Sequence, residues 1–119
     1  MQSWPIKDPD EVLDYDINWA MRLYSADELI SYNAAVALDP SKALPVDPAT
    51  VVVPADTIAT STFTLPLGIT STQASFTNTK SKIWLSGGTV GASYEILNRI
   101  TTAGGRTMDQ TVKIKLKEK

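Results

Sequence analysis

The sequence predicts an all-β protein, an antiparallel sandwich of six or seven short strands, and three observations support this. Thirteen of the fourteen threonines fall between Thr57 and Thr111, where they alternate with apolar residues. Threonine is branched at Cβ, so it packs well on a pleated surface. Turn residues interrupt this half of the chain at the short intervals that hairpins need. The last segment alternates apolar residues with lysines, as a half-buried strand does.

The chain is expected to begin with an extended arm over residues 1–11, because Pro5 and Pro9 disfavour a helix there. The sandwich domain is then expected over residues 12–119. Its first strand follows from a strict period of two between residues 13 and 19. The apolar face of this strand carries Leu13, Tyr15, Ile17 and Trp19, and the polar face carries Asp14, Asp16 and Asn18.

Residues 24–55 are expected to form a proline-rich insertion between the first two strands. Ser25 and Glu28 have the spacing of a capping box and indicate one helical turn. Residues 30–38 are rich in alanine and fit either a short strand or a helical turn. The prolines between residues 40 and 54 argue against a helix and favour edge strands or an extended path. Such an excursion is where a scaffold usually carries variable contacts.

The threonine-rich half is expected to supply the other strands, over residues 58–65, 69–76, 81–85, 94–102 and 108–116. In the first of them, alternation predicts that Ile58 shares a face with the threonines. Gly104 and Gly105 supply the positive φ that the last hairpin needs. Tyr94 follows Gly91 just before a strand, as in the tyrosine corner of immunoglobulin-like sandwiches. The predicted fold class is therefore an immunoglobulin-like antiparallel β-sandwich with an N-terminal arm and a proline-rich insertion.

The chain contains neither cysteine nor histidine. Disulfides and thiol chemistry are therefore excluded, and zinc, copper or haem sites are not expected. We expect a protein that is not an enzyme, with no catalytic residues, no cofactor and no metal. The remaining catalytic alternative is a carboxylate pair, Asp14 with Asp16 or Asp27 with Glu28, but no neighbour separates their pKa values as acid–base catalysis requires. A cluster of five acidic residues favours a solvated face over a calcium site, because no glycine-punctuated loop accompanies it. These acidic residues are Asp8, Asp10, Glu11, Asp14 and Asp16.

Charge is distributed unevenly along the chain. Residues 1–56 contain ten acidic and three basic residues, a net charge of −7, whereas residues 57–119 contain three acidic and eight basic residues, a net charge of +5. Either the halves neutralise each other within one domain, or the acidic face of one copy binds the basic face of the next. The alternating lysines of residues 113–119 favour a soluble strand edge over nucleic-acid binding. No apolar stretch approaches the ~20 residues of a membrane helix, and no secretory signal begins the chain, so no membrane partner is expected.

Several apolar residues outside the predicted core are candidate contacts for partner proteins. They are Trp4, Pro5, Tyr24, Val51, Val53 and Trp84. Trp4 lies in the arm, where it could dock onto a neighbouring protein. Alternation places Trp84 on the polar face of its strand, beside Lys80 and Lys82. There it could stack on a sugar or on a partner's surface, or it could close one end of the sandwich.

Three segments resemble the small fiber-tail adaptor proteins of tailed bacteriophages and prophages. One is the opening Trp4-Pro5-Ile6-Lys7-Asp8-Pro9-Asp10, continued to Tyr15; the next is Asp56-Thr57-Ile58-Ala59-Thr60-Ser61-Thr62-Phe63-Thr64. The last begins with Trp84-Leu85-Ser86-Gly87-Gly88-Thr89 and ends with Asn98-Arg99-Ile100-Thr101-Thr102-Ala103-Gly104-Gly105-Arg106-Thr107. The resemblance covers residues 4–20 and 56–112, and Tyr24 to Ala55 departs from the shorter pattern of this group.

The resemblance implies a non-enzymatic protein of the virion tail, assembled in the cytoplasm of the bacterial host. It implies many copies, arranged as a ring or collar, that link other tail proteins of the tube, adaptor or nozzle type to the receptor-binding fibers. Two alternatives stay open from the sequence. One is an immunoglobulin-like module that binds carbohydrate on the cell surface through Trp84, and the other is a head decoration or completion protein.

Overall fold

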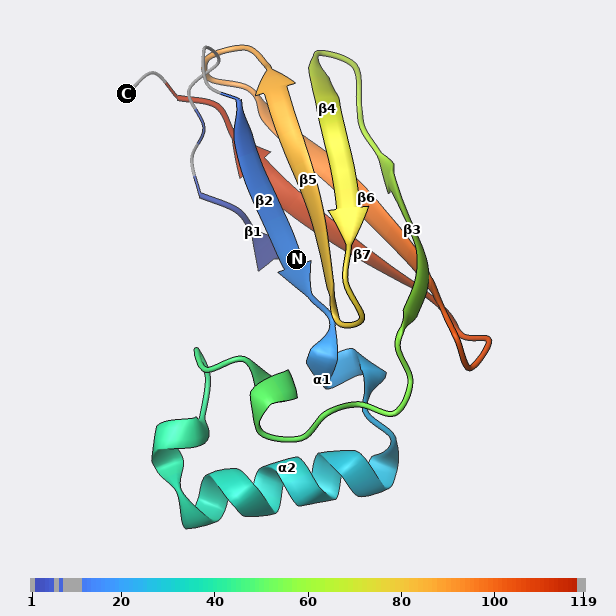
Figure 1. The fold of residues 1–119 in the computed structure, drawn as a ribbon. Helices are drawn as coiled ribbons and strands as arrows, with labels where there is room; N and C mark the ends of the chain where they lie inside the picture. The colour runs from blue at the N-terminus through green and yellow to red at the C-terminus, as the bar shows by residue number, and fades with distance from the viewer. Residues whose placement is uncertain (1, 6, 8–11, 118–119) are drawn as a thin grey trace.

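The structure is a computed structural model that describes residues 2–5, 7 and 12–117. In this part of the chain, two sheets pack face to face and a helical segment lies across one end of them (Figure 1). The all-β sandwich that the sequence predicts is confirmed. The strands are β1 (Gln2–Ser3), β2 (Leu13–Asn18), β3 (Ile58–Thr64), β4 (Ile69–Phe76), β5 (Lys80–Gly87), β6 (Ser93–Thr102) and β7 (Thr107–Lys115).

One sheet has the strand order β1-β7-β6-β3 and the other has the order β2-β5-β4. All neighbouring strands are antiparallel except β1 and β7, which are parallel. Alternation along β6 and β7 places Ile96, Ile100, Val112 and Ile114 inside, where each is fully buried. Two clusters of buried apolar side chains, one toward each end of the sandwich, form the core between the sheets.

The helical segment joins β2 to β3 and contains α1 (Ala20–Leu23), α2 (Ala26–Leu38) and two 3₁₀ turns, η1 (Pro40–Lys42) and η2 (Pro48–Thr50). We call residues 20–57 the helical platform. The capping box predicted at Ser25 and Glu28 is confirmed, and it begins a helix of 13 residues, so residues 30–38 are helical. Within the described residues, no helix has the length and apolar character needed to cross a membrane.

Two predictions about local structure were wrong. The proline-rich stretch after α2 does not form edge strands, because Pro40 and Pro48 each begin a 3₁₀ turn. Proline suits the first position of a helical turn, since the backbone N–H that it lacks would have no partner within the turn there. Ile58 does not share the face of the threonines in β3, because an irregularity between Ile58 and Thr60 shifts the register against β6. The shift turns Ile58 into the core, where it is 5% exposed.

The Tyr94 side chain makes the contact that the sequence predicts at the start of β6. Its hydroxyl oxygen accepts a hydrogen bond of 3.0 Å from the backbone N–H of Thr89, five residues upstream. The ring also packs close to Gly68, where a Cβ would lie 3.1 Å from the hydroxyl oxygen and where φ is +101°. This tyrosine therefore fixes the turns at the end of the sandwich away from the platform; the immunoglobulin-like assignment itself stays a prediction.

Candidate protein-docking surface

A buried hydrogen-bond cluster anchors the platform where β2 ends. Trp19 is fully buried, and its indole N–H lies 3.1 Å from Ser81 Oγ and 3.0 Å from Asn98 Oδ1. Asn98 donates through Nδ2 to Ser61 Oγ at 2.9 Å and to the Thr62 carbonyl at 3.0 Å. Because β5, β6 and β3 supply these partners, the cluster joins both sheets at the point where the chain enters the platform.

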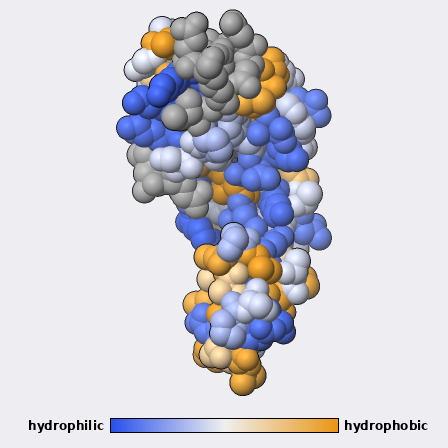
Figure 2. Space-filling model, turned by 90° about the vertical axis from the view of Figure 1, so that its left-hand side faces the viewer, coloured by the Kyte–Doolittle hydropathy of each residue, from blue (hydrophilic) through white to orange (hydrophobic). Residues whose placement is uncertain are grey.

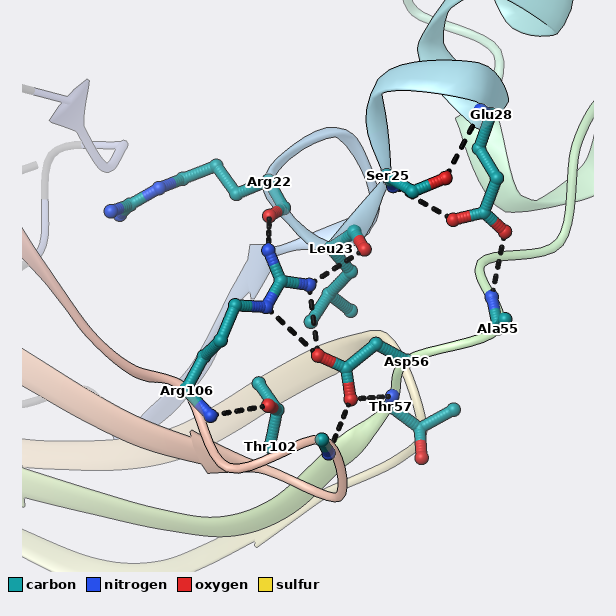
Figure 3. A network of polar contacts seen from close by, with 10 residues as sticks. Arg22, Leu23, Ser25, Glu28, Ala55, Asp56, Thr57, Thr102 and Arg106 are labelled. Atoms are coloured by element: carbon teal, nitrogen blue, oxygen red, sulfur yellow. Dashed lines mark hydrogen bonds and ion pairs between the residues drawn. The ribbon is translucent and has the colours of Figure 1, made fainter.

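A second anchor joins the far end of the platform to the hairpin between β6 and β7 (Figure 3). The Asp56 carboxylate pairs with the Arg106 guanidinium at 2.8 Å, and the same guanidinium donates to the Leu23 carbonyl at 2.8 Å. The backbone N–H of Gly104 donates to Asp56 Oδ1 at 2.8 Å. A Cβ on Gly104 would lie 3.1 Å from that oxygen, so a residue without a side chain lets the hairpin approach closely.

The Glu28 carboxylate connects the beginning of α2 to the end of the platform. It accepts one hydrogen bond of 2.8 Å from the backbone N–H of Ser25 and another of 2.8 Å from that of Ala55 (Figure 3). These two amides hold the pKa of Glu28 below its ordinary value of 4.5. A single carboxylate therefore closes the platform into a loop whose two ends lie together.

A third anchor ties the middle of the platform to the sandwich. Asp47 accepts a hydrogen bond of 3.0 Å from the Asn18 side chain and pairs with Lys80 at 3.2 Å. The Asn18 hydrogen bond is the main reason why the pKa of Asp47 lies below its ordinary value of 3.8. Inside the platform, the Tyr24 hydroxyl lies 2.7 Å from the Pro48 carbonyl, and burial raises the pKa of Tyr24. The platform is thus fixed at its beginning, middle and end.

Acidification is expected to destabilise this arrangement. Burial raises the pKa of Asp56, but the Gly104 amide, the Thr102 hydroxyl and Arg106 lower it more, so the folded-state pKa of Asp56 lies below 3.8. Glu28 and Asp47 are shifted in the same direction. A carboxyl group with a lowered folded-state pKa stabilises the fold fully above its unfolded-state pKa and loses that contribution as the pH falls through the folded-state pKa. The free energy of unfolding in urea should therefore be constant above about pH 5 and should fall below about pH 4.

The Asp56→Asn variant is the control for this prediction. At neutral pH its free energy of unfolding should be lower than that of the wild type by about 1.5–3 kcal/mol, the usual contribution of hydrogen bonds to a charged group. As the pH falls, the free energy of unfolding of this variant should decrease less steeply than that of the wild type, because one titrating group is gone. An unchanged slope below about pH 4 would show that Asp56 does not contribute to the pH dependence.

The platform exposes a set of large apolar side chains to solvent. The described residues of this kind are Met21, Leu29, Ile30, Leu38, Leu44, Val46 and Val53. Ile30 is 66% exposed and Leu38 is 89% exposed, and α2 carries no charged residue after Glu28. Figure 2 shows hydrophobic residues at the lower end of the molecule, where the platform lies, with hydrophilic residues among them. Several exposed large apolar side chains on a fixed support are typical of a protein interaction site.

A groove of about 490 Å³ adjoins this surface, between the platform, the arm and the sandwich. Trp4, Met21, Leu44 and Pro45 supply apolar parts of its wall. Arg22 lies over the Trp19 ring at 4.9 Å and donates to the Asp109 carbonyl at 2.8 Å, so its cation is held in place. The groove brings Trp4 of the arm next to the platform, which sequence spacing does not predict.

The structure places the other predicted contact residues in different surroundings. Pro5 is exposed, Val51 is half-buried and Val53 is 76% exposed, whereas Tyr24 is buried against Tyr32. Trp4 is half-buried: its ring stacks on Tyr15 at 5.1 Å and its indole N–H donates to the Asp16 carbonyl at 3.0 Å. Trp84 is half-exposed on the outer face of β5, with the Lys82 ammonium 5.5 Å from its ring centre.

Sequence reasoning missed the residues that α2 exposes, chiefly Ile30 and Leu38. Their signal is a run of ten uncharged residues, 29–38, directly after a capping box. The predicted acidic cluster is only partly described: Asp14 and Asp16 are exposed on β2, and Asp8, Asp10 and Glu11 lie outside the described residues. Within the described residues, no three carboxylates gather in a way that could hold a metal ion.

Comparison with known proteins identifies the kind of protein to which this surface belongs. The family model of the podophage GP4 fiber-tail adaptor protein gp77 matches residues 42–115, which are 74 of the 119 residues. The chain belongs to this family. The resemblance in the sequence is confirmed, and the adaptor has a structural role in the phage tail, where its family implies that it binds other tail proteins. No curated protein matches the adaptor.

The family match covers only part of the candidate docking surface of the adaptor. It begins at the end of η1 and ends with β7, so it includes the second half of the platform and strands β3 to β7. The exposed Leu44, Val46 and Val53 lie inside it. The helix α2, the strand β2 and the opening residues 4–20 lie outside it. The apolar face of α2 is therefore a feature of this chain that the family match does not account for.

Proposed function

We propose that this adaptor is a non-enzymatic connector that is present in many copies and links the phage tail to its fibers. The copies would form a ring or collar around the tail and assemble in the cytoplasm of the bacterial host. The observation that carries the proposal is the set of exposed apolar side chains on the platform. It occurs in a protein that belongs to the fiber-tail adaptor family. Because three anchors fix the platform, a partner that binds there would lose little binding free energy to ordering of the chain.

The charge distribution supports association between copies. The platform contains five acidic residues against Arg22 and Lys42, a net charge of −3. Strand β7 runs from the hairpin beside the platform to the opposite end of the sandwich (Figure 1), where Lys113, Lys115 and Lys117 follow one another. Complementary potentials at opposite ends guide the docking of one copy onto another and fix its orientation.

The experiment that tests the proposal is cryo-electron microscopy of complete virions combined with quantitative mass spectrometry. We expect several copies per particle and density for the sandwich between the tail and the fibers. Absence from mature particles, or a single copy, would contradict the connector role. Density on the head would support the alternative of a head decoration or completion protein.

A carbohydrate-binding function is the second candidate, because Trp84 lies half-exposed on the outer face of β5. Its cross-strand neighbours are Asp14 on β2 and Gln73 on β4, and both are polar. An aromatic ring between polar side chains is a common arrangement for stacking on a sugar. Binding to a glycan array that disappears in the Trp84→Ala variant would favour this function over the connector role.

A further inference from the structure

One side of the sandwich, formed by the edge strands β3 and β4, is open. Within the described strands, β4 pairs only with β5, and every residue of β4 after Ile69 is exposed. The chain carries no charged residue between Thr57 and Thr79. Natural edge strands are usually protected by charges, by proline or by a covering segment. Within the described part of the chain, β4 has none of these, and its one protective feature is an irregularity in its pairing with β5 at Thr72.

The opposite side of the sandwich is closed by the arm. The Trp4 backbone N–H donates to the Lys113 carbonyl at 2.9 Å, and the Trp4 indole N–H donates to the Asp16 carbonyl at 3.0 Å. The arm thus bonds to β7 in one sheet and to β2 in the other. Among the residues that the structure describes, the fold covers the edges of its two sheets on this side and leaves the edges β3 and β4 uncovered on the other.

Beyond Ile69, the inner face of β4 is also uncovered by the described residues. Ala74 and Phe76 pair with Ile83 and Ser81 of β5, which are buried, so both point toward the interior of the sandwich. Phe76 is nevertheless 44% exposed, and a groove of about 350 Å³ lies beside it, lined by Ser61, Ala74, Ser75 and Phe76. An inward aromatic ring that stays 44% exposed beside an open edge leaves apolar surface that another element could cover.

We propose that β4 of one copy pairs antiparallel with β4 of a second copy, which would join the two three-stranded sheets into one. Free backbone groups of the two edges would form the hydrogen bonds, and the two Phe76 rings would be covered. The proposal concerns contact between copies and does not depend on where in the particle the adaptor lies. It would hold even if the connector role were wrong.

The register follows from which face each residue of β4 occupies. Thr70 pairs with Ser86 and Ser75 with Lys82, both on the outer face, whereas Ile69 and Phe76 face inward. The extra residue, Thr72, reverses the alternation between the two halves of β4. A two-fold pairing of Thr70 with Ser75 of the second copy therefore places outer residues opposite outer residues. It also places Ile69 opposite Phe76, both on the inner face.

Charge and area indicate how strong this contact is. Two identical uncharged strands meet without the repulsion that like charges cause when they lie opposite each other. The edge offers the eight residues of β4, however, whereas a standard stable interface uses ~20–30 residues on each side. We therefore expect a dimer that dissociates on dilution and forms at the high local concentration of an assembly.

Sedimentation equilibrium of the purified full chain tests the proposal with two matched double variants. In the proposed register, Thr70→Lys with Ser75→Lys places lysines opposite lysines twice, and its dimerisation constant should be at least ~10-fold weaker than that of the wild type. Thr70→Lys with Ser75→Glu places opposite charges in contact at the same positions, and it should dimerise at least as well as the wild type. Thermal unfolding of each monomer checks that both variants are folded.

Two outcomes would overturn the proposal. One is a wild type that remains monomeric at millimolar concentration, and the other is equal dimerisation of the two double variants. Ile30→Glu on the exposed face of α2 serves as the control for a different interface. It should leave the dimer unchanged, and loss of the dimer in this variant would assign the contact to α2 and contradict the role of β4. Absence of the adaptor from virions, in contrast, would affect only the connector proposal.

Discussion

Replacing Trp19 with alanine is expected to lower the free energy of unfolding by about 3–5 kcal/mol, the usual cost of removing a large aromatic side chain from a core. The Trp19 side chain has no exposed surface and packs with Leu23 and Ile100 in the core cluster nearest the platform. The substitution also removes the N–H that lies between Ser81 and Asn98. Urea unfolding followed by tyrosine and tryptophan fluorescence measures the loss. Because small domains are stable by only about 5–15 kcal/mol, this variant should be close to unfolded at 37 °C.

Two variants separate the causes of this effect. Trp19→Phe keeps most of the buried volume and removes the N–H, so its loss should be only about 1–2 kcal/mol, since Ser81 Oγ still donates to Asn98 Oδ1 at 2.6 Å. Trp84→Ala removes the same side chain from a half-exposed position and should cost less than about 1 kcal/mol. If Trp19→Ala cost no more than Trp84→Ala, the cluster would not anchor the platform.

Placing glutamate at both Ile30 and Leu38 is expected to remove the adaptor from virions without unfolding it. Both side chains lie on the exposed surface of α2, so charges there remain in solvent and the free energy of unfolding should change by less than about 0.5 kcal/mol. In a docked interface, the same charges would be buried without partners. Loss of a central apolar contact costs about 2 kcal/mol or more, so the number of adaptor copies per particle should fall at least ~10-fold.

The matched control for this experiment is Leu67→Glu, in the turn between β3 and β4. Leu67 is 98% exposed, so the substitution adds one glutamate, half the charge added on α2, at a leucine as solvated as Leu38 but away from the platform. Quantitative mass spectrometry of purified particles should find this variant at the wild-type level. Normal incorporation of the Ile30→Glu, Leu38→Glu variant would rule out the face of α2 as the docking surface.

Stability and the proposed docking thus depend on different parts of the molecule. The buried cluster at Trp19 and the ion pair of Asp56 with Arg106 position the platform, whereas the residues that would meet a partner contribute little to the core. This separation makes the two predictions above independent. A core variant should lower stability first and incorporation second, and a surface variant should lower incorporation alone.

The sequence by itself determined where strands β2 to β7 lie and which faces of β2 and β7 point inward. A period of two is a local property, so Leu13 to Asn18 and the alternating segments of β6 and β7 could be assigned from neighbouring residues alone. The capping box at Ser25 and the all-β class follow from the same kind of short-range chemistry. The family resemblance was also visible in the order of short segments, and the match over residues 42–115 confirms it.

Only the tertiary structure decided which residues meet across the chain. Asp56 pairs with Arg106 and Asp47 pairs with Lys80, and Glu28 accepts a hydrogen bond from the Ala55 N–H. No local sequence pattern links these positions. The irregularity that turns Ile58 inward and the exposure of Phe76 depend on the register between strands, which neighbouring strands set together. For the same reason the length of α2 was missed. Its residues bury little surface of their own, and the helix is held by Tyr32, which packs on Tyr24, and by the Glu28 contact to Ala55 at its beginning.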